Sequence, residues 1–228
     1  MGYKREFIEF MVRSGVLLFG EFTTKSGRQS PYFINTGNYR TGSQAARLGG
    51  FYARCIADHM ERGDISAETA VLFGPAYKGI PLAVAAAMAL AEKEGRDLGY
   101  CFNRKEAKDH GEGGNLVGCP LKDGDRVLII EDVITAGTAV RETLPLLQRA
   151  AKVRIEGLVV SVDRMERGRG EKTAIQELKE ELGIPTYPIV TVRDVIDALY
   201  NRPVDGKILI DDEVRQRMEA YLKQYCVE

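Results

Sequence analysis

The sequence predicts an α/β fold in which helices flank a central, mainly parallel sheet. Helix-like and strand-like runs alternate through the middle of the 228-residue chain, a pattern that favours strands connected by helices. Several of the strand-like runs are continuously apolar, as expected of strands buried on both faces. Polar loops that contain glycine follow these runs, and open parallel sheets bind ligands at the carboxyl ends of their strands.

Residues 1–42 are expected to form a small N-terminal hood made of a helix and a hairpin. Apolar residues from Phe7 to Met11 repeat at helical spacing, and Gly15 is a stop signal for that helix. Two strand-like runs then flank Lys25-Ser26-Gly27-Arg28, which predicts a hairpin with a glycine turn. Taken alone, Lys25 is most simply a solvated lysine of that turn.

Residues 43–228 are expected to form one compact α/β core without a linker or an internal repeat. Its first helix runs from Ser43 to about Arg62 and has an apolar side made of Leu48, Phe51, Tyr52, Cys55 and Ile56. The other expected elements are strands at 71–74, 98–102, 127–130, 155–162 and 187–190, and helices at 80–93, 139–151, 172–182, 192–200 and 212–225. Gly183 and Thr191 are expected to end one helix and cap the next. Pro145 lies inside a predicted helix and indicates a kink or a later helix start.

The composition argues against several classes of protein. A formal net charge of -1, from 32 basic and 33 acidic residues, gives no global field for nucleic acid or an anionic membrane. Four cysteines without a Cys-x-x-Cys pair, together with two histidines, support neither a disulfide framework nor a zinc site, and fit reduced thiols in the cytoplasm. His59 is expected to be a helix-end charge. The N-terminus lacks the apolar core of a signal peptide, and the apolar run 80–91 is too short to cross a bilayer.

The segment 126–139 carries the strongest functional pattern. An apolar strand leads directly into Glu131 and Asp132, which fall at its carboxyl end and could hold sugar hydroxyls or a magnesium ion. Thr135-Ala136-Gly137-Thr138 then offers small side chains and free N–H groups at a helix start, which is an anion cradle. The alternative is a strand-to-helix turn capped by Thr135 or Thr138, with Glu131 and Asp132 as two solvated acids before it.

Three further loops are expected at the same edge of the sheet. Residues 74–79 connect a strand to a helix and place Lys78 beside backbone donors, as a pyrophosphate requires. Residues 103–115 are polar and rich in glycine, with little to bury. The strand at 155–162 delivers Arg164. Taken singly, the segment 103–115 is a solvated loop of mixed charge, and Arg164 could be a salt-bridged strand end.

The segments 74–79, 104–110 and 132–138 together resemble those of orotate phosphoribosyltransferases, which have the type I phosphoribosyltransferase fold. The resemblance runs from about Phe7 to Tyr200. It implies an enzyme that joins orotate to phosphoribosyl pyrophosphate (PRPP) and gives orotidine 5'-monophosphate and pyrophosphate in pyrimidine (UMP) biosynthesis. It further implies Mg²⁺ bound mainly through PRPP, a cytoplasmic location, and a homodimer whose lid loop, Arg104 to Asn115, is shared across the interface.

The resemblance also implies roles for individual residues. The catalytic group would be Lys105, Lys108, His110 and Asp132. PRPP would contact Lys25, Tyr77, Lys78, Arg104, Lys105, Lys108, His110, Glu131, Asp132, Val133, Ile134, Thr135, Ala136, Gly137, Thr138 and Ala139. Orotate would contact Lys25, Phe33, Ile34, Thr135 and Arg164, with Arg164 suited to the orotate carboxylate. Ile34 replaces an aromatic residue seen in some relatives, and Glu131 replaces a common Asp.

Two other functions compete with this interpretation. A phosphoribosyltransferase for another base would keep the PRPP residues and change those that face the base. A regulatory protein of the same fold would sense PRPP and bind nucleic acid, which calls for an added DNA-binding unit or a basic face. The near-zero net charge and the retention of Lys105, Lys108 and His110 favour the enzyme, with no nucleic acid or membrane partner.

Overall fold

A computed structural model describes residues 2–24, 27–105, 115–134, 137–168 and 170–227, and it has the predicted α/β fold. Within these residues the central sheet has six strands in the order β5-β4-β3-β6-β7-β8. The strands are β3 (Thr69–Gly74), β4 (Gly99–Asn103), β5 (Leu116–Gly118), β6 (Arg126–Ile130), β7 (Arg154–Asp163) and β8 (Thr186–Thr191). All neighbours are parallel except β4 and β5, which are antiparallel. The edge strand β5 escapes sequence-based prediction because three residues carry no periodicity.

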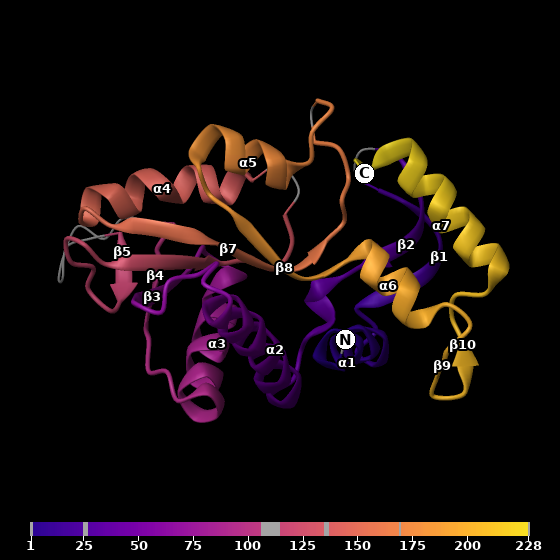
Figure 1. Cartoon of the computed structure of the whole chain (residues 1–228), viewed down its shortest axis with the longest axis horizontal. Helices are drawn as coiled ribbons and strands as arrows, with labels where there is room; N and C mark the ends of the chain where they lie inside the picture. Colours follow the sequence, from indigo (N-terminus) through magenta and orange to yellow (C-terminus); the bar gives the residue numbers. More distant parts are fainter. Residues whose placement is uncertain (1, 25–26, 106–114, 135–136, 169, 228) are drawn as a thin grey trace.

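Helices cover both faces of the sheet. Figure 1 shows α2 (Gly42–Glu61) and α3 (Gly79–Glu94) against one face, and α4 (Thr138–Ala150) and α5 (Ala174–Leu182) against the other. The predicted apolar side of α2 is confirmed, because all five of its residues are buried. Strands β3, β6 and β7 therefore lie between two helical layers, which explains their continuous apolar runs.

The helix boundaries correct two details of the sequence-based prediction. A later start at Pro145 is wrong, because α4 begins at Thr138 and continues through the proline. Val140, Leu144 and Leu147 are buried on one side of that helix, and this packing on both sides of the proline offsets the lost backbone hydrogen bond. Helix α5 begins at Ala174 rather than 172, because Thr173 caps it. The predicted stop at Gly183 and cap at Thr191 are confirmed.

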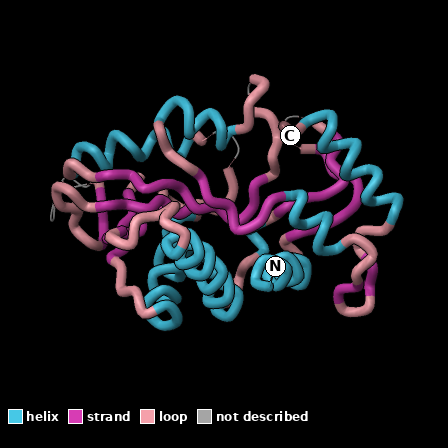
Figure 2. Tube along the Cα trace, in the orientation of Figure 1, coloured by secondary structure: helices cyan, strands magenta, loops and turns pink. Residues whose placement is uncertain are grey.

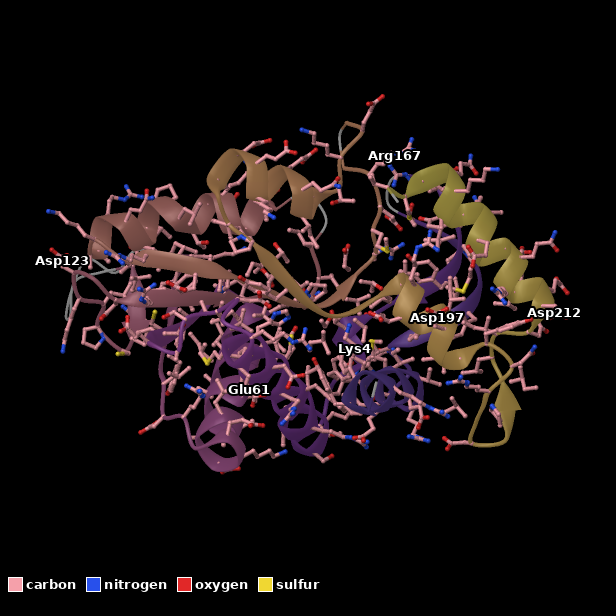
Figure 3. The ribbon with its side chains drawn as sticks, in the orientation of Figure 1. Lys4, Glu61, Asp123, Arg167, Asp197 and Asp212 are labelled. Atoms are coloured by element: carbon pink, nitrogen blue, oxygen red, sulfur yellow. The ribbon has the colours of Figure 1, made fainter. Side chains whose placement is uncertain are left out.

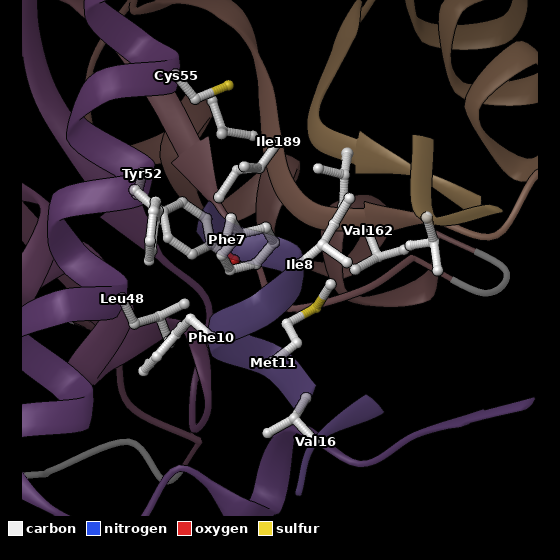
Figure 4. Close-up of a cluster of buried hydrophobic side chains, with 14 of the residues drawn as sticks. Phe7, Ile8, Phe10, Met11, Val16, Leu48, Tyr52, Cys55, Val162 and Ile189 are labelled. Carbon is white, nitrogen blue, oxygen red and sulfur yellow. The ribbon is translucent and has the colours of Figure 1, made fainter. Parts of the chain in front are cut away.

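The N-terminal residues form the predicted helix and hairpin. Helix α1 (Gly2–Arg13) is followed by Gly15, whose φ is 64°. Strands β1 (Leu17–Thr23) and β2 (Gln29–Ile34) pair antiparallel, and the short 3-10 helix η1 (Thr36–Asn38) leads into α2. Figure 4 shows side chains of α1 packed beside Leu48, Tyr52 and Cys55 of α2, with Val162 and Ile189 from the sheet. The predicted hood thus shares the core of the sheet, and a boundary at residue 42 stays a prediction.

The C-terminal residues return to the hairpin. After α6 (Val192–Leu199) come the two-residue strands β9 (Pro203–Val204) and β10 (Lys207–Ile208), and then α7 (Asp212–Tyr225). Figures 1 and 2 show α7 lying along β1 and β2, away from the helices that cover the sheet. Within the described residues, no helix is both long and apolar enough to cross a membrane.

Candidate active site

The loops that the sequence singles out meet at one edge of the sheet. Strands β3, β4, β6 and β7 run parallel as neighbours, so their carboxyl ends lie side by side. The described residues that follow these ends are 75–78, 104–105, 131–134 and 164–168. The fold therefore brings Tyr77, Lys78, Arg104, Lys105, Glu131, Asp132 and Arg164 to the same edge.

Asp132 is the centre of this edge. Its Oδ2 accepts hydrogen bonds from Lys78 Nζ at 2.8 Å and Thr36 Oγ1 at 2.7 Å, and its Oδ1 accepts from the N–H of Val133 at 2.7 Å. Only 8% of the residue is exposed, so these donors replace much of the water a carboxylate needs. Lys78 and Asp132, which were both predicted as site residues, thus form an ion pair.

Thr36 belongs to this site, although the sequence gives no sign of it. Its hydroxyl donates to Asp132 and also accepts from Lys78 Nζ at 3.2 Å. It lies 96 residues before Asp132 in the chain, and a single threonine in a polar segment matches no motif. Only the folded chain shows that η1 reaches the carboxyl edge of β6.

The backbone around the two acids is held from two sides. The carbonyl of Asp132 accepts from the N–H of Ser161 at 2.9 Å and from its hydroxyl at 2.6 Å. The hydroxyl of Tyr52 donates to the carbonyl of Glu131 at 2.7 Å. Helix α2 and strand β7 therefore fix the position of both acids before any ligand arrives. Sequence reasoning placed Tyr52 only in the core and gave Ser161 no role.

Glu131 has a different environment from Asp132. Burial raises the pKa of its carboxyl to about 7, and the charge of Asp132 acts in the same direction. Its Oε1 accepts from the N–H of Asp132 at 3.2 Å. Near neutral pH this side chain exists in both protonation states, so it can either donate or accept a hydrogen bond with a hydroxyl group.

The loop between β3 and α3 makes a tight turn, and a side chain from the neighbouring strand β4 holds it in place. A Cβ at Gly74 would lie 2.2 Å from the carbonyl oxygen of Gly79, so only glycine allows this turn. The N–H of Ala76 donates to Oδ1 of the buried Asn103 at 2.8 Å. Tyr77, which follows, is 67% exposed. Asn103, at the end of β4, therefore positions the loop that carries Tyr77 and Lys78.

The predicted pyrophosphate residues that the structure describes lie close together. Lys105 Nζ is 5.2 Å from the centroid of the Tyr77 ring. The N–H of Arg104 donates to the carbonyl of Asn115 at 2.7 Å, so these two described residues lie together at this edge. Lys108 and His110 lie outside the described residues, and so do Lys25, Thr135 and Ala136.

The predicted phosphate cradle is described from Gly137 onward. Gly137 has a φ of 66° and is the N-cap of α4, so it supplies no side-chain cap to the first turn. The alternative in which Thr138 caps the helix is wrong, because Thr138 is its first residue. Val133 forms a parallel bridge with Val162, and Ile134 is buried. Ala139 lies in the first turn of α4, whose N–H groups suit an anion.

The predicted base-contacting residues that the structure describes lie in or beside the hairpin. Phe33 is 36% exposed and stacks on Phe22 with ring centroids 5.4 Å apart, whereas Ile34 packs against the core. Arg164 follows β7, and its guanidinium lies 4.9 Å from the centroid of the Tyr32 ring. Arg164 also pairs with Glu166, at 2.6 Å from Nη2 to Oε1.

Two other predictions from the sequence concern His59 and the absence of a zinc site. His59 lies in the last turn of α2, with its Nδ1 2.8 Å from Oδ2 of Asp64. Among the described residues, no group of three or more His, Cys, Asp or Glu side chains could hold a metal ion. A divalent cation at the edge would therefore need oxygen ligands from a substrate in addition to Glu131 or Asp132.

The chain is similar to known proteins in both sequence and fold. Residues 44–186 match the model of the phosphoribosyl transferase domain family. The chain is 56% identical to an orotate phosphoribosyltransferase of Lachnoclostridium phytofermentans over 99% of this chain and 98% of that protein. It is 54% identical to one of Clostridium acetobutylicum over 99% of both chains. The crystal structure of orotate phosphoribosyltransferase from Francisella tularensis superimposes with a TM-score of 0.81 at 35% identity, and covers 97% of this chain and 100% of that one.

Proposed function

The chain belongs to the orotate phosphoribosyltransferase family, and from that premise we propose how its residues carry out the reaction. The enzyme transfers the phosphoribosyl group of PRPP to orotate, releasing pyrophosphate, in pyrimidine nucleotide biosynthesis. The observation that carries the proposal is the meeting of Lys78 and Asp132 at the carboxyl edge of the sheet.

Asp132 and Glu131 bind the ribose hydroxyls in this proposal. Displacement at the anomeric carbon builds positive charge on the ribose, and a fixed carboxylate nearby stabilises that charge. The support is that Tyr52 and Ser161 hold the backbone of both acids, by donating hydrogen bonds to the carbonyls of Glu131 and Asp132. Because Glu131 has a pKa of about 7, it can match whichever hydrogen-bonding role a hydroxyl requires.

Lys78 and its neighbours bind the pyrophosphate. Lys78 Nζ donates hydrogen bonds to Asp132 and Thr36. An arriving pyrophosphate offers stronger acceptors, so Lys78 exchanges one anionic partner for another at little cost in desolvation. Tyr77, Arg104, Lys105, Lys108 and His110 surround the same group and stabilise the charge that develops on it.

The 5'-phosphate binds at the start of α4, from Thr135 to Ala139. The support is the first turn of that helix, which follows a glycine N-cap and offers N–H groups and the positive end of the helix dipole. Val133 and Ile134 line the approach from β6.

Orotate binds between Phe33, Ile34 and Arg164, with Lys25 and Thr135 completing its contacts. Arg164 supplies the cation for the orotate carboxylate.

Magnesium fits this site as a partner of the substrate. The described residues offer the carboxylates of Glu131 and Asp132 but no full set of metal ligands, and Mg²⁺ commonly pairs one or two carboxylates with phosphate oxygens. Bound in this way, Mg²⁺ neutralises charge on the pyrophosphate.

We also propose a cytoplasmic homodimer in which the segment Arg104 to Asn115 serves the partner subunit's site. The four cysteines are free thiols, which suits a reducing compartment. The support for a shared segment is that its first and last residues, Arg104 and Asn115, are hydrogen-bonded to each other at the sheet edge.

The proposal is tested by following orotate consumption in the ultraviolet. Orotate should disappear only when PRPP and a divalent cation are both present, and addition of a chelator should stop the reaction. Uracil, adenine and hypoxanthine serve as competing substrates in the same assay. Equal or faster turnover of one of these bases would assign the enzyme to another base and exclude orotate as its main substrate.

A further inference from the structure

Arg164 is fixed on two sides by groups of its own chain. Its Nε and Nη2 both donate to Oε1 of Glu166, at 2.9 and 2.6 Å. The face of its guanidinium lies 4.9 Å from the centroid of the Tyr32 ring, and only 15% of its side chain is exposed. Burial alone would lower the pKa of Arg164, but Tyr32 and Glu166 raise it above its ordinary value. Among the described residues, Nη1 has no hydrogen-bonding partner, so that nitrogen is left for a ligand.

Glu166 is in turn held by the C-terminal helix. The hydroxyl of Tyr221 in α7 donates to Oε1 of Glu166 at 2.7 Å. Burial and this hydrogen bond raise the pKa of Tyr221 to about 12, so the hydroxyl stays a donor at neutral pH. Nη1 of Arg28 lies 3.7 Å from the other carboxylate oxygen, Oε2.

The backbone at the end of the chain fixes the same segment. Glu166 forms an antiparallel bridge with Cys226, and the N–H of Arg167 donates to the carbonyl of Tyr225 at 2.9 Å. The N–H of Val227 donates to the carbonyl of Met165 at 3.1 Å. Figure 3 shows Arg167 beside the C-terminal end of α7. The residues that follow β7 are thus tied to the last residues of the chain.

We propose that Glu166 and Tyr221 are positioning residues for orotate, which orient Arg164 so that its remaining edge meets the orotate carboxylate. The proposal rests on the function assigned to Arg164 above. A free arginine side chain loses rotamer entropy when a ligand fixes it, whereas Arg164 is already held by Glu166 and Tyr32. The C-terminal helix thereby becomes part of the base site without touching the base.

Two variants separate this positioning from charge. Tyr221→Phe removes one hydroxyl and leaves every charge in place. Glu166→Asp keeps the carboxylate but shortens the side chain by one methylene, so it can no longer reach Tyr221 and Arg164 together. Each should raise the KM for orotate roughly tenfold, the scale of one hydrogen bond to a charged group. The kcat and the KM for PRPP should stay within about twofold, because among the described residues neither side chain hydrogen-bonds or pairs with Asp132 or Lys78.

Tyr225→Phe is the matched control. Tyr225 lies on the same helix, and its hydroxyl has no hydrogen-bonding partner among the described residues. Cζ of Arg28 lies 5.1 Å from the centroid of the Tyr225 ring. Phenylalanine keeps that ring contact, so neither KM should change. Thermal unfolding of all variants shows whether the fold is intact at the assay temperature.

Arg164→Ala distinguishes failure of this inference from failure of the site assignment. If it raises the KM for orotate selectively while Tyr221→Phe and Glu166→Asp leave that KM unchanged, the positioning role is wrong and the base site stands. If Arg164→Ala raises both KM values equally, Arg164 does not bind the base and the inference fails with it. An equal rise of both KM values in the Tyr221 and Glu166 variants would show a merely structural role and overturn the inference.

Discussion

At the scale of single residues, the site depends on one buried carboxylate. Asp132 accepts hydrogen bonds from Lys78 and Thr36, which belong to different parts of the chain. Both donors bond more strongly to a charged acceptor than to a neutral one, so a neutral replacement weakens the whole group of contacts. The carboxylate is thus fixed at the point where we propose that the ribose becomes positively charged.

We expect Asp132→Asn to lower turnover of orotate roughly a hundredfold or more, the scale of losing one preorganised electrostatic group. The asparagine keeps the shape of the side chain but removes the charge next to the ribose. Asp64→Asn is the control, because Asp64 pairs with His59 before β3 begins, at the amino edge of the sheet. Steady-state kinetics at saturating substrates measure the effect. Near-normal turnover in Asp132→Asn would make the acidic pair a structural strand end.

Glu131 makes stability depend on pH. Folding raises the pKa of the Glu131 carboxyl from its ordinary value of 4.5 to about 7. Between these two pH values the folded chain therefore binds this proton more tightly than the unfolded chain does. Stability from this group is therefore present below the ordinary carboxyl pKa and is lost as pH rises through about 7. Glutamine cannot ionise, so Glu131→Gln should remove this dependence of stability on pH.

We expect Glu131→Gln to be more stable than the wild type at pH 8, by on the order of 1–2 kcal/mol after allowing for partial exposure. At pH 4.5 the two proteins should differ little. Urea unfolding across this range measures the difference. A constant difference between the two proteins at every pH would show that Glu131 does not titrate in this window.

At the scale of elements, the packing of α2 against α3 relies on a glycine contact. A Cβ on Gly49 would lie 2.4 Å from the carbonyl oxygen of Ala85 in α3. The backbone of a helix cannot move aside locally, so the two helices would have to separate. Helix α2 also carries Tyr52, which holds the carbonyl of Glu131, so the position of this helix bears on the site as well as on the core.

We expect Gly49→Ala to lower the free energy of unfolding by about 1–3 kcal/mol, as overpacking of a core usually does. Gly50→Ala is the matched control in the same helix, since its Cβ would meet only Nζ of Lys93, at the flexible end of that side chain. Alanine is the better helix former by about 1 kcal/mol, so Gly50→Ala should be neutral or stabilising. Urea unfolding of both variants checks the difference. Equal free energies of unfolding for Gly49→Ala and Gly50→Ala would mean that α2 and α3 can move apart without loss of stability.

At the scale of the whole molecule, the chain closes on itself around the carboxyl edge of the sheet. Helix α1 and the hairpin share the core with α2, and η1 delivers Thr36 to Asp132. The last residues, 225–227, pair with 165–167 beyond β7. The first and the last parts of the sequence thus both support a site whose main motif lies in the middle.

We expect two inactive variants to restore activity when their subunits are mixed. Lys108 lies outside the described residues, and its placement in the partner's site rests on the family resemblance alone. If that placement holds, a heterodimer of Lys108→Ala and Asp132→Asn contains one intact site, and random exchange should restore about a quarter of the wild-type sites. The assay is orotate turnover after subunit exchange, with each homodimer alone as control. Heterodimers that stay inactive would assign Lys108 to its own subunit.

The sequence by itself determined the α/β class, most of the elements and the motifs at the strand ends. Continuous apolar runs such as 127–130 and glycine-bearing loops are local patterns, and local patterns are visible without a fold. The edge strand β5 and the continuous course of α4 through Pro145 were beyond its reach. Three residues carry no period, and burial on both sides of a proline is a property of packing.

Only the tertiary structure decided which side chains meet. Thr36, Tyr52 and Ser161 belong to no motif, yet each holds Glu131 or Asp132 in place. Arg164 and Glu166, which pair with each other, are only two residues apart in sequence. Tyr221, whose hydroxyl holds Glu166, comes from the last helix, 55 residues beyond Glu166. Hydrogen bonds of this kind depend on distance in space, and the sequence encodes such distances only through the packing of the whole chain.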